Sequence, residues 1–190
     1  MSLTTLDPKT ALIVIDLQKG IANANLVHPI ADILANTRTL LDVFRANNLP
    51  VVLVNVAGRA PGRTEQGPRA NLTFTDNWTE LLPQLNQQPT DNLVTKRSWG
   101  AFATTDLESQ LNARGVTQVV VTGIATSTGV EATARQAYEQ GFNVTLATDA
   151  MTDMREEAHD YSIRNVFPRL GETGSTQQII ALLQERNPAS

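Results

Sequence analysis

The sequence of 190 residues contains no cysteine. This absence excludes disulfide bonds, thiolate metal sites and a cysteine nucleophile. Long apolar runs are also missing, and hydrophobic residues make up 41% and charged residues 18%, a balance typical of soluble globular proteins rather than membrane-spanning or disordered chains. Positive charge is scarce, because 15 Lys and Arg stand against 19 Asp and Glu, a formal net charge of -4. That balance argues against a nucleic-acid surface.

The N-terminal segment lacks the basic region and apolar core of a secretory signal. We therefore expect a cytoplasmic protein with no membrane association. The length fits one domain, residues 1–190, with enough interior for a sizeable core. We find no internal repeat, low-complexity segment or interdomain linker.

Apolar runs alternate with helical patterns along the chain. Strands are predicted at 11–16, 49–56, 91–98, 116–123 and 142–151, with a candidate edge strand at 170–175. Helices are predicted at 28–48, 104–115, 126–141, 155–170 and 175–187. This alternation predicts an α/β fold of three layers, α/β/α, around a mainly parallel, roughly six-stranded, Rossmann-like sheet.

Polar groups follow three of these strands. Asp16 ends the first strand, Lys96 ends the third, and a hydroxyl-rich glycine turn from Ala125 to Gly129 follows the fourth. Alone, such an Asp is an ordinary helix cap and such a Lys an ordinary surface charge. Because parallel strands place their carboxyl ends on one edge of the sheet, where sites of such folds lie, the three together predict a functional site. The turn precedes a helix and suits an anion or oxyanion.

Three segments carry a resemblance to a known family: ALIVIDLQKG, LVTKRSWGAFATTDLESQLNARGV and VVVTGIATSTGVEATARQAYEQGFNVTLATDAM. They resemble the isochorismatase-like hydrolases, or cysteine hydrolase family, in order and approximate spacing. Most members use an Asp, a Lys and a Cys as a catalytic triad. Asp16 and Lys96 match the first two positions, and Gly129 occupies that of the cysteine. Covalent attack by a thiolate is therefore excluded.

The resemblance implies a different chemistry for this chain, since true isochorismatases also have glycine at this position and cleave a vinyl ether. Asp16 would protonate the enol-ether methylene carbon, water would capture the oxocarbenium ion, and Lys96 would hold Asp16 in place. Gly129 would leave room for a cyclic substrate. An adjacent Lys lowers a carboxyl pKa, so only desolvation could keep Asp16 protonated. TSTGVEATA and RSWGAF differ from the segments of a dedicated isochorismatase.

Two alternatives stay open at this point. In one, loss of the nucleophile leaves an inactive, small-molecule-binding member of the family. In the other, Ser127 or Thr128 replaces the cysteine in an amidase, although a helix turns by about 100° per residue and neither neighbour points where position 129 points.

The resemblance also implies how a small carboxylated substrate would bind. Arg59, Arg63 and Gln66 lie in a loop from Ala57 to Asn77 that matches the one with which isochorismatases clamp a carboxylate. Trp99 would wall the pocket, alongside Phe102. Thr126, Ser127 and Thr128 are further expected substrate-binding residues. They lie in the turn, in which the Ala125 and Gly129 N–H groups would form the oxyanion pocket. Ile124-Ala125 matches a cis peptide of the family, and Thr126, Thr133 and Asp149 match positions that support the turn and the neighbouring strand end.

We expect no metal ion and no other cofactor. Nicotinamidases of the family bind a divalent ion through an Asp and two His beyond the second strand, where this chain reads VNVAGRAPGR. Its two histidines, His28 and His159, lie in other segments and receive no role. Family resemblance further implies a homodimer or higher homo-oligomer.

Overall fold

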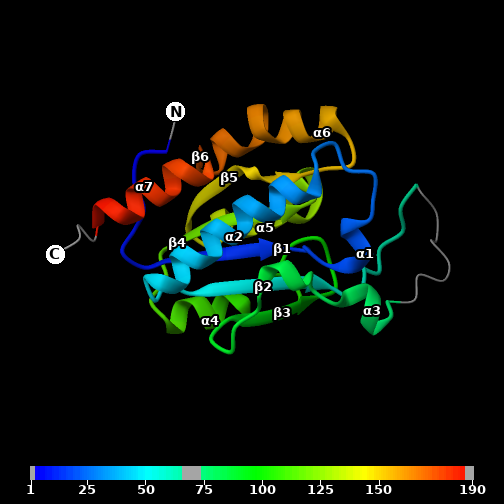
Figure 1. The fold of residues 1–190 in the computed structure, drawn as a ribbon. Helices are drawn as coiled ribbons and strands as arrows, with labels where there is room; N and C mark the ends of the chain where they lie inside the picture. The colour runs from blue at the N-terminus through cyan, green and yellow to red at the C-terminus, as the bar shows by residue number, and fades with distance from the viewer. Residues whose placement is uncertain (1–2, 66–73, 187–190) are drawn as a thin grey trace.

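A six-stranded sheet in which every strand is parallel to its neighbours runs through the protein (Figure 1). The computed structural model describes residues 3–65 and 74–186. The strand order is β3-β2-β1-β4-β5-β6. The strands are β1 (Thr10–Ile15), β2 (Val51–Val56), β3 (Asn92–Lys96), β4 (Gln118–Ile124), β5 (Asn143–Thr152) and β6 (Glu172–Gly174). The order reverses direction between β1 and β4, which is where ligand sites form in doubly wound sheets.

Helices lie between successive strands, and one more follows the last strand. The main ones are α2 (Ile30–Ala46), α4 (Leu107–Ala113), α5 (Glu131–Glu139), α6 (Glu156–Tyr161) and α7 (Thr176–Arg186). Short helices α1 (Lys19–Ala22) and α3 (Asp76–Thr79) and the 3₁₀ turn η1 (Pro83–Leu85) were not predicted. Four residues give too little periodicity to reveal a helix.

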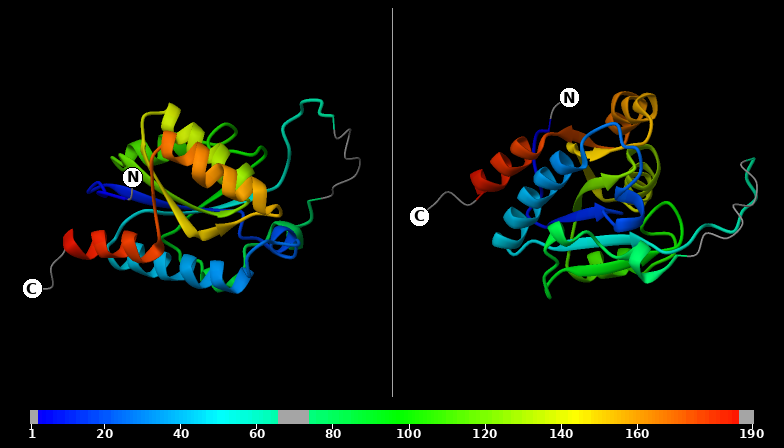
Figure 2. Two further views of the ribbon diagram at one scale, coloured as in Figure 1. Left: turned by 90° about the horizontal axis from the view of Figure 1, so that it is seen from above. Right: turned by 45° about the vertical axis from the view of Figure 1, so that its right-hand side comes forward.

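The central strand β1 contributes to both hydrophobic layers because alternate side chains point to opposite faces. Ile13 and Ile15 lie in one cluster with residues of α4 and α5, whereas Leu12 and Val14 lie in the other with residues of α2 and α7. Figure 2 shows the sheet with helices on both sides. This arrangement confirms the predicted three-layer α/β fold and explains why the buried strands are continuously apolar.

Two predicted helices are interrupted. The helix predicted at 126–141 begins with a π-helical turn, Thr126–Val130, in which the Val130 N–H bonds to the Ala125 carbonyl five residues earlier, at 3.1 Å. The segment predicted as a helix at 155–170 begins as α6 and then continues as the π turn Ser162–Val166 and the 3₁₀ turn Phe167–Arg169. Pro168 lacks an N–H and cannot continue an α-helix.

Nothing in the described part of the chain has the combination of helix length and apolar character needed to cross a bilayer.

Replacement of Phe44 by alanine tests the α2 side of the core. Phe44 is fully buried on α2, so its truncation should lower the free energy of unfolding by about 3–5 kcal/mol. Urea unfolding measures this, with Thr39→Ala as the control, because Thr39 is exposed on the same helix and its loss should change stability by about 0.5 kcal/mol or less. Similar midpoints for both variants would contradict the proposed packing.

Candidate active site

Asp16 follows β1 at the point where the strand order reverses. Its backbone has φ 52°, the left-handed conformation, which Asp tolerates better than most residues. The Asp16 N–H still donates to the Val54 carbonyl at 2.9 Å, and the Asp16 carbonyl accepts from the Gln18 N–H at 2.8 Å. The chain therefore leaves the sheet sharply at Asp16.

Lys96 forms a buried ion pair with Asp16, although β2 separates their two strands in the sheet. Lys96 Nζ lies 2.7 Å from Asp16 Oδ2, and the two residues are 1% and 4% exposed. The ammonium also donates to the carbonyls of Ser98, at 3.2 Å, and Trp99, at 2.8 Å. Its three donors thus have three acceptors, which buried charge requires.

The Asp16 carboxyl is bonded on one side only. Oδ2 accepts from Lys96, whereas Oδ1 is buried without a hydrogen-bond partner among the described residues. Burial raises the pKa of Asp16 from its usual 3.8 to about 6, and the charge and hydrogen bond of Lys96 oppose this rise without cancelling it. Desolvation therefore prevails over the adjacent Lys, and Asp16 carries a proton in a substantial fraction of molecules near pH 6.

Gly129 faces this carboxyl from the π-helical turn. A Cβ atom at position 129 would lie 3.2 Å from Asp16 Oδ2, 2.9 Å from Ile15 Cγ2 and 3.3 Å from the Ile124 carbonyl oxygen. A side chain here would therefore point at Asp16 and crowd Ile15. The glycine thus keeps the turn in close contact with Asp16 without placing a side chain against the carboxyl.

Thr133 links the turn to the loop that holds Lys96. Its hydroxyl donates to the Gly129 carbonyl at 2.7 Å and accepts from the Ala101 N–H at 3.1 Å. Gln136, one turn further along α5, accepts the Phe102 N–H at 3.0 Å. The loop that contains the acceptors of the Lys96 ammonium is thus bonded to α5, the helix that directly follows the turn.

Two residues that sequence reasoning missed hold the first half of the turn. Asp153 Oδ2 accepts from both the backbone N–H and the hydroxyl of Ser127, at 2.8 and 2.7 Å. His159 Nδ1 bonds to the Thr126 hydroxyl at 2.8 Å, and its ring lies 4.7 Å from that of His28. An acidic residue just beyond a predicted strand end is the signal that could have revealed Asp153.

Asp149, in contrast, supports a different element from the one predicted. Its Oδ1 accepts from the backbone N–H and hydroxyl of Thr176, at 2.7 and 2.9 Å, at the first residue of α7. An anionic side chain stabilises that end of a helix, so Asp149 supports α7 and not the turn.

The predicted oxyanion pocket lies in the same turn. The Ile124-Ala125 peptide bond is cis, as the resemblance implies. The Ala125 carbonyl accepts from the N–H groups of Thr128 and Val130, both at 3.1 Å. Ala125 and Gly129 are both buried within the turn, and the binding role of their N–H groups stays a prediction.

The predicted substrate-binding residues are not all brought together. Arg59 and Arg63 are exposed on the segment after β2, part of which projects from the body of the molecule (Figures 1 and 2), and no hydrogen bond or ion pair among the described residues joins them to the Asp16–Lys96 pair. Gln66 lies outside the described residues. Trp99 is 68% exposed, whereas Phe102 is buried in the core against Phe142.

The side chains around this site do not fit the metal centre of nicotinamidases. Across residues 3–65 and 74–186, no group of three or more His, Asp or Glu side chains is placed to hold a metal ion. We therefore derive no chemical step through a metal.

The fold and the site define a doubly wound α/β protein with a buried Asp–Lys pair opposite a glycine-containing turn. Residues 10–178 match the isochorismatase domain. The uncharacterized isochorismatase family protein YwoC of Bacillus subtilis is 38% identical over 178 residues, covering 90% of this chain and 93% of the relative. This chain belongs to the isochorismatase family.

Two further comparisons agree with that assignment. Nicotinamidase 3 of Arabidopsis thaliana is 32% identical over 164 residues, covering 82% of this chain and 79% of the relative, so the family includes hydrolases. The structure of an isochorismatase family protein from Burkholderia thailandensis superimposes with a TM-score of 0.91 at 39% identity, covering 96% of this chain and 100% of the other.

The protonation of Asp16 can be measured directly. Carboxyl ¹³C NMR of the aspartates should show Asp16 titrating near pH 6, and Lys96→Met should move its midpoint upward because the charge that opposes protonation is lost. A midpoint near 4 for Asp16 in the unmodified protein would show that the ion pair outweighs desolvation.

Proposed function

We propose that this protein is a metal-independent hydrolase that cleaves a small carboxylated enol ether by acid catalysis. The observation that carries the proposal is the half-bonded carboxyl of Asp16. Oδ2 is held by Lys96, Oδ1 has no partner among the described residues, and position 129, which faces the group, carries no side chain. A buried carboxyl with one free oxygen is suited to donate a proton. Position 129, which faces it, offers no nucleophile.

The proposed reaction uses one proton and one water. Neutral Asp16 transfers its proton to the terminal methylene carbon, and the C=C π electrons form the new C–H bond. The resulting oxocarbenium ion accepts water at its central carbon, and Asp16, now a carboxylate, takes a proton from that water. The hemiketal then collapses to a ketone and an alcohol. Atoms and charge balance without any covalent bond to the protein.

Lys96 acts as the positioning residue of this step. Its bonds to the Ser98 and Trp99 carbonyls fix the ammonium, so Asp16 is always held through Oδ2. When Asp16 gives up its proton, the new carboxylate lies beside a cation at 2.7 Å. This attraction stabilises the charge that develops as the proton leaves.

The amidase alternative is less well supported by the hydroxyl geometry. The Ser127 hydroxyl donates to Asp153 Oδ2, and the carboxyl of Asp153 also accepts N–H groups of Ser127, Met154 and Arg155. Ser127 is thus part of a structural cap, with its proton engaged away from the Asp16–Lys96 pair. Position 129, which faces Asp16, carries no hydroxyl.

Turnover of isochorismate tests the proposal, with pyruvate release measured by a coupled assay. Asp16→Asn should lower kcat by at least about 100-fold because general-acid catalysis is lost. The Ser127→Ala/Thr128→Ala double variant should lose far less kcat than Asp16→Asn if no hydroxyl attacks the substrate. Binding of isochorismate without release of pyruvate would contradict the proposal and favour a binding protein. Loss of activity in the double variant together with a covalent acyl adduct in mass spectra would favour the amidase alternative.

The pH dependence provides a second test. The proposed mechanism needs protonated Asp16, so kcat/KM should be constant below about pH 6 and fall about tenfold per pH unit above it. Initial rates from pH 4.5 to 8.5 measure this, with far-UV circular dichroism at each pH to show that the protein stays folded. An activity that rises with pH through 6 would indicate that Asp16 acts as a base.

A further inference from the structure

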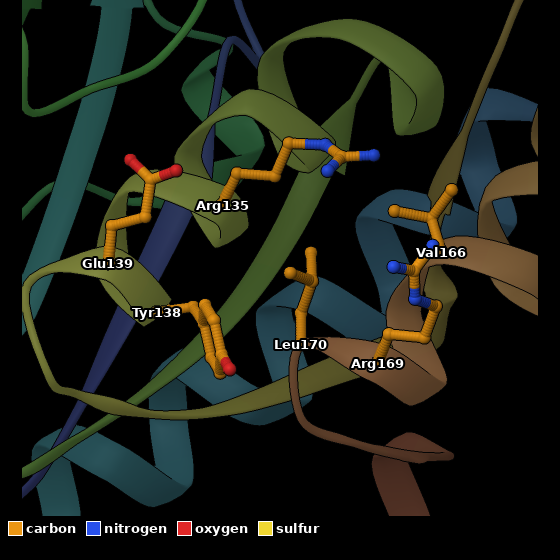
Figure 3. A pocket seen from close by; sticks show the side chains of 6 residues that line it. All are labelled: Arg135, Tyr138, Glu139, Val166, Arg169 and Leu170. Carbon is orange, nitrogen blue, oxygen red and sulfur yellow. The ribbon is translucent and has the colours of Figure 1, made fainter.

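A groove with a cavity volume of about 390 Å³ lies beside the candidate active site. Ser127 and Thr128 of the turn line one part of the groove, and Trp99 lines another. The third part is lined by residues of α6 and of the turns that follow it. A smaller hollow of about 210 Å³ continues it and shares Arg135 and Arg169 with it. Figure 3 shows these two arginines on facing elements, with Leu170 between them.

The groove is positively charged within a chain of net negative charge. Arg135, Arg155 and Arg169 line it, against one carboxylate, Glu131. Glu131 is already satisfied, because Oε1 accepts from Arg135 at 3.0 Å and Oε2 accepts from the Ser162 hydroxyl at 2.6 Å. One arginine is therefore neutralised and two are left.

Arg155 and Arg169 have no compensating acid. Within the described residues, neither guanidinium takes part in an ion pair or a side-chain hydrogen bond, whereas the neighbouring Arg164 is paired with Asp160 at 2.8 Å. Free guanidinium groups on a concave surface form bidentate bonds with carboxylates. The groove thus offers two anion-binding groups that the fold itself does not use.

Aromatic side chains border the same groove. Trp99 is 68% and Tyr161 63% exposed, a large apolar area for a protein surface, and both line it. Such rings offer flat faces to a planar ligand while the arginines bind its charge. The combination fits a planar organic anion better than an inorganic ion.

The groove is physically coupled to the catalytic pair. The backbone carbonyl of Trp99 accepts from Lys96 Nζ at 2.8 Å, and Thr128 directly precedes Gly129. A ligand in the groove therefore lies against the two segments that hold and face Asp16.

We infer that this groove binds the carboxylate and the planar part of the substrate, with Arg155 and Arg169 as the carboxylate-binding residues. The inference rests on the proposed function for the identity of the ligand as substrate. It moves the carboxylate-binding role from Arg59 and Arg63, in the loop after β2, to the side of the sheet edge formed by α5 and α6. The substrate class becomes planar carboxylates whose enol ether reaches past Thr128 to Asp16.

A binding experiment tests the groove without catalysis. The chain has two tryptophans, so Trp78→Phe leaves Trp99 as the only reporter. Benzoate should change the Trp99 fluorescence saturably, whereas benzyl alcohol and benzylammonium, of similar size, should not. Arg155→Gln and Arg169→Gln in this background should each raise the Kd for benzoate at least about tenfold. Arg164→Gln is the matched control and should leave the Kd unchanged.

Kinetics connect the groove to the reaction. With isochorismate as substrate, Arg155→Gln should raise KM at least about tenfold and lower kcat by a smaller factor, whereas Asp16→Asn should act mainly on kcat. An unchanged Kd for benzoate and an unchanged KM in both arginine variants would overturn the groove assignment but not the proposed reaction. Benzoate binding as predicted, with no turnover by any form, would overturn the proposed reaction and leave the carboxylate site standing.

Discussion

The buried ion pair between Asp16 and Lys96 is the constraint on which the other features of the site depend. Two charges that are 4% and 1% exposed are costly to bury unless each finds partners. Lys96 finds three, and two of them are backbone carbonyls of the loop after β3. This loop must therefore stay in one conformation, and its bonds to Thr133 and Gln136 of α5 fix it there.

The sheet order makes this pair possible. Asp16 and Lys96 are 80 residues apart in sequence, and their strands are separated by β2. A parallel sheet places all carboxyl ends on one edge, so a long lysine side chain can reach across the end of one strand to the next. The turn after β4 approaches from the other side because the order reverses between β1 and β4. Three distant segments thus meet through topology alone.

Sequence patterns predicted the sheet, its helices and the three strand ends, because buried parallel strands are continuously apolar and a charged residue that ends one is conspicuous. They could not predict which group partners which. Asp153 and His159 support the turn through contacts between segments 26 and 33 residues apart, which no periodicity encodes. The groove arginines were missed for a similar reason. Arg135, Arg155 and Arg169 lie on separate elements, and only the folded chain shows that Arg164, in the same region, is neutralised while Arg155 and Arg169 are not.

The absence of a side chain at position 129 and the raised pKa of Asp16 are physically connected. A Cβ atom there would lie 3.2 Å from Asp16 Oδ2, so a polar side chain could reach the carboxyl and donate a hydrogen bond, which would favour the ionised form. With glycine, Lys96 is the carboxyl's only hydrogen-bonding partner in the described structure, and desolvation can outweigh that one contact, so the pKa rises to about 6. Glycine at this position thus provides neither a nucleophile nor a second hydrogen bond to Asp16. Under the proposed mechanism, Lys96 orients the acid and stabilises the charge that Asp16 carries after proton transfer, so the ion pair serves a reaction that forms no covalent bond to the protein.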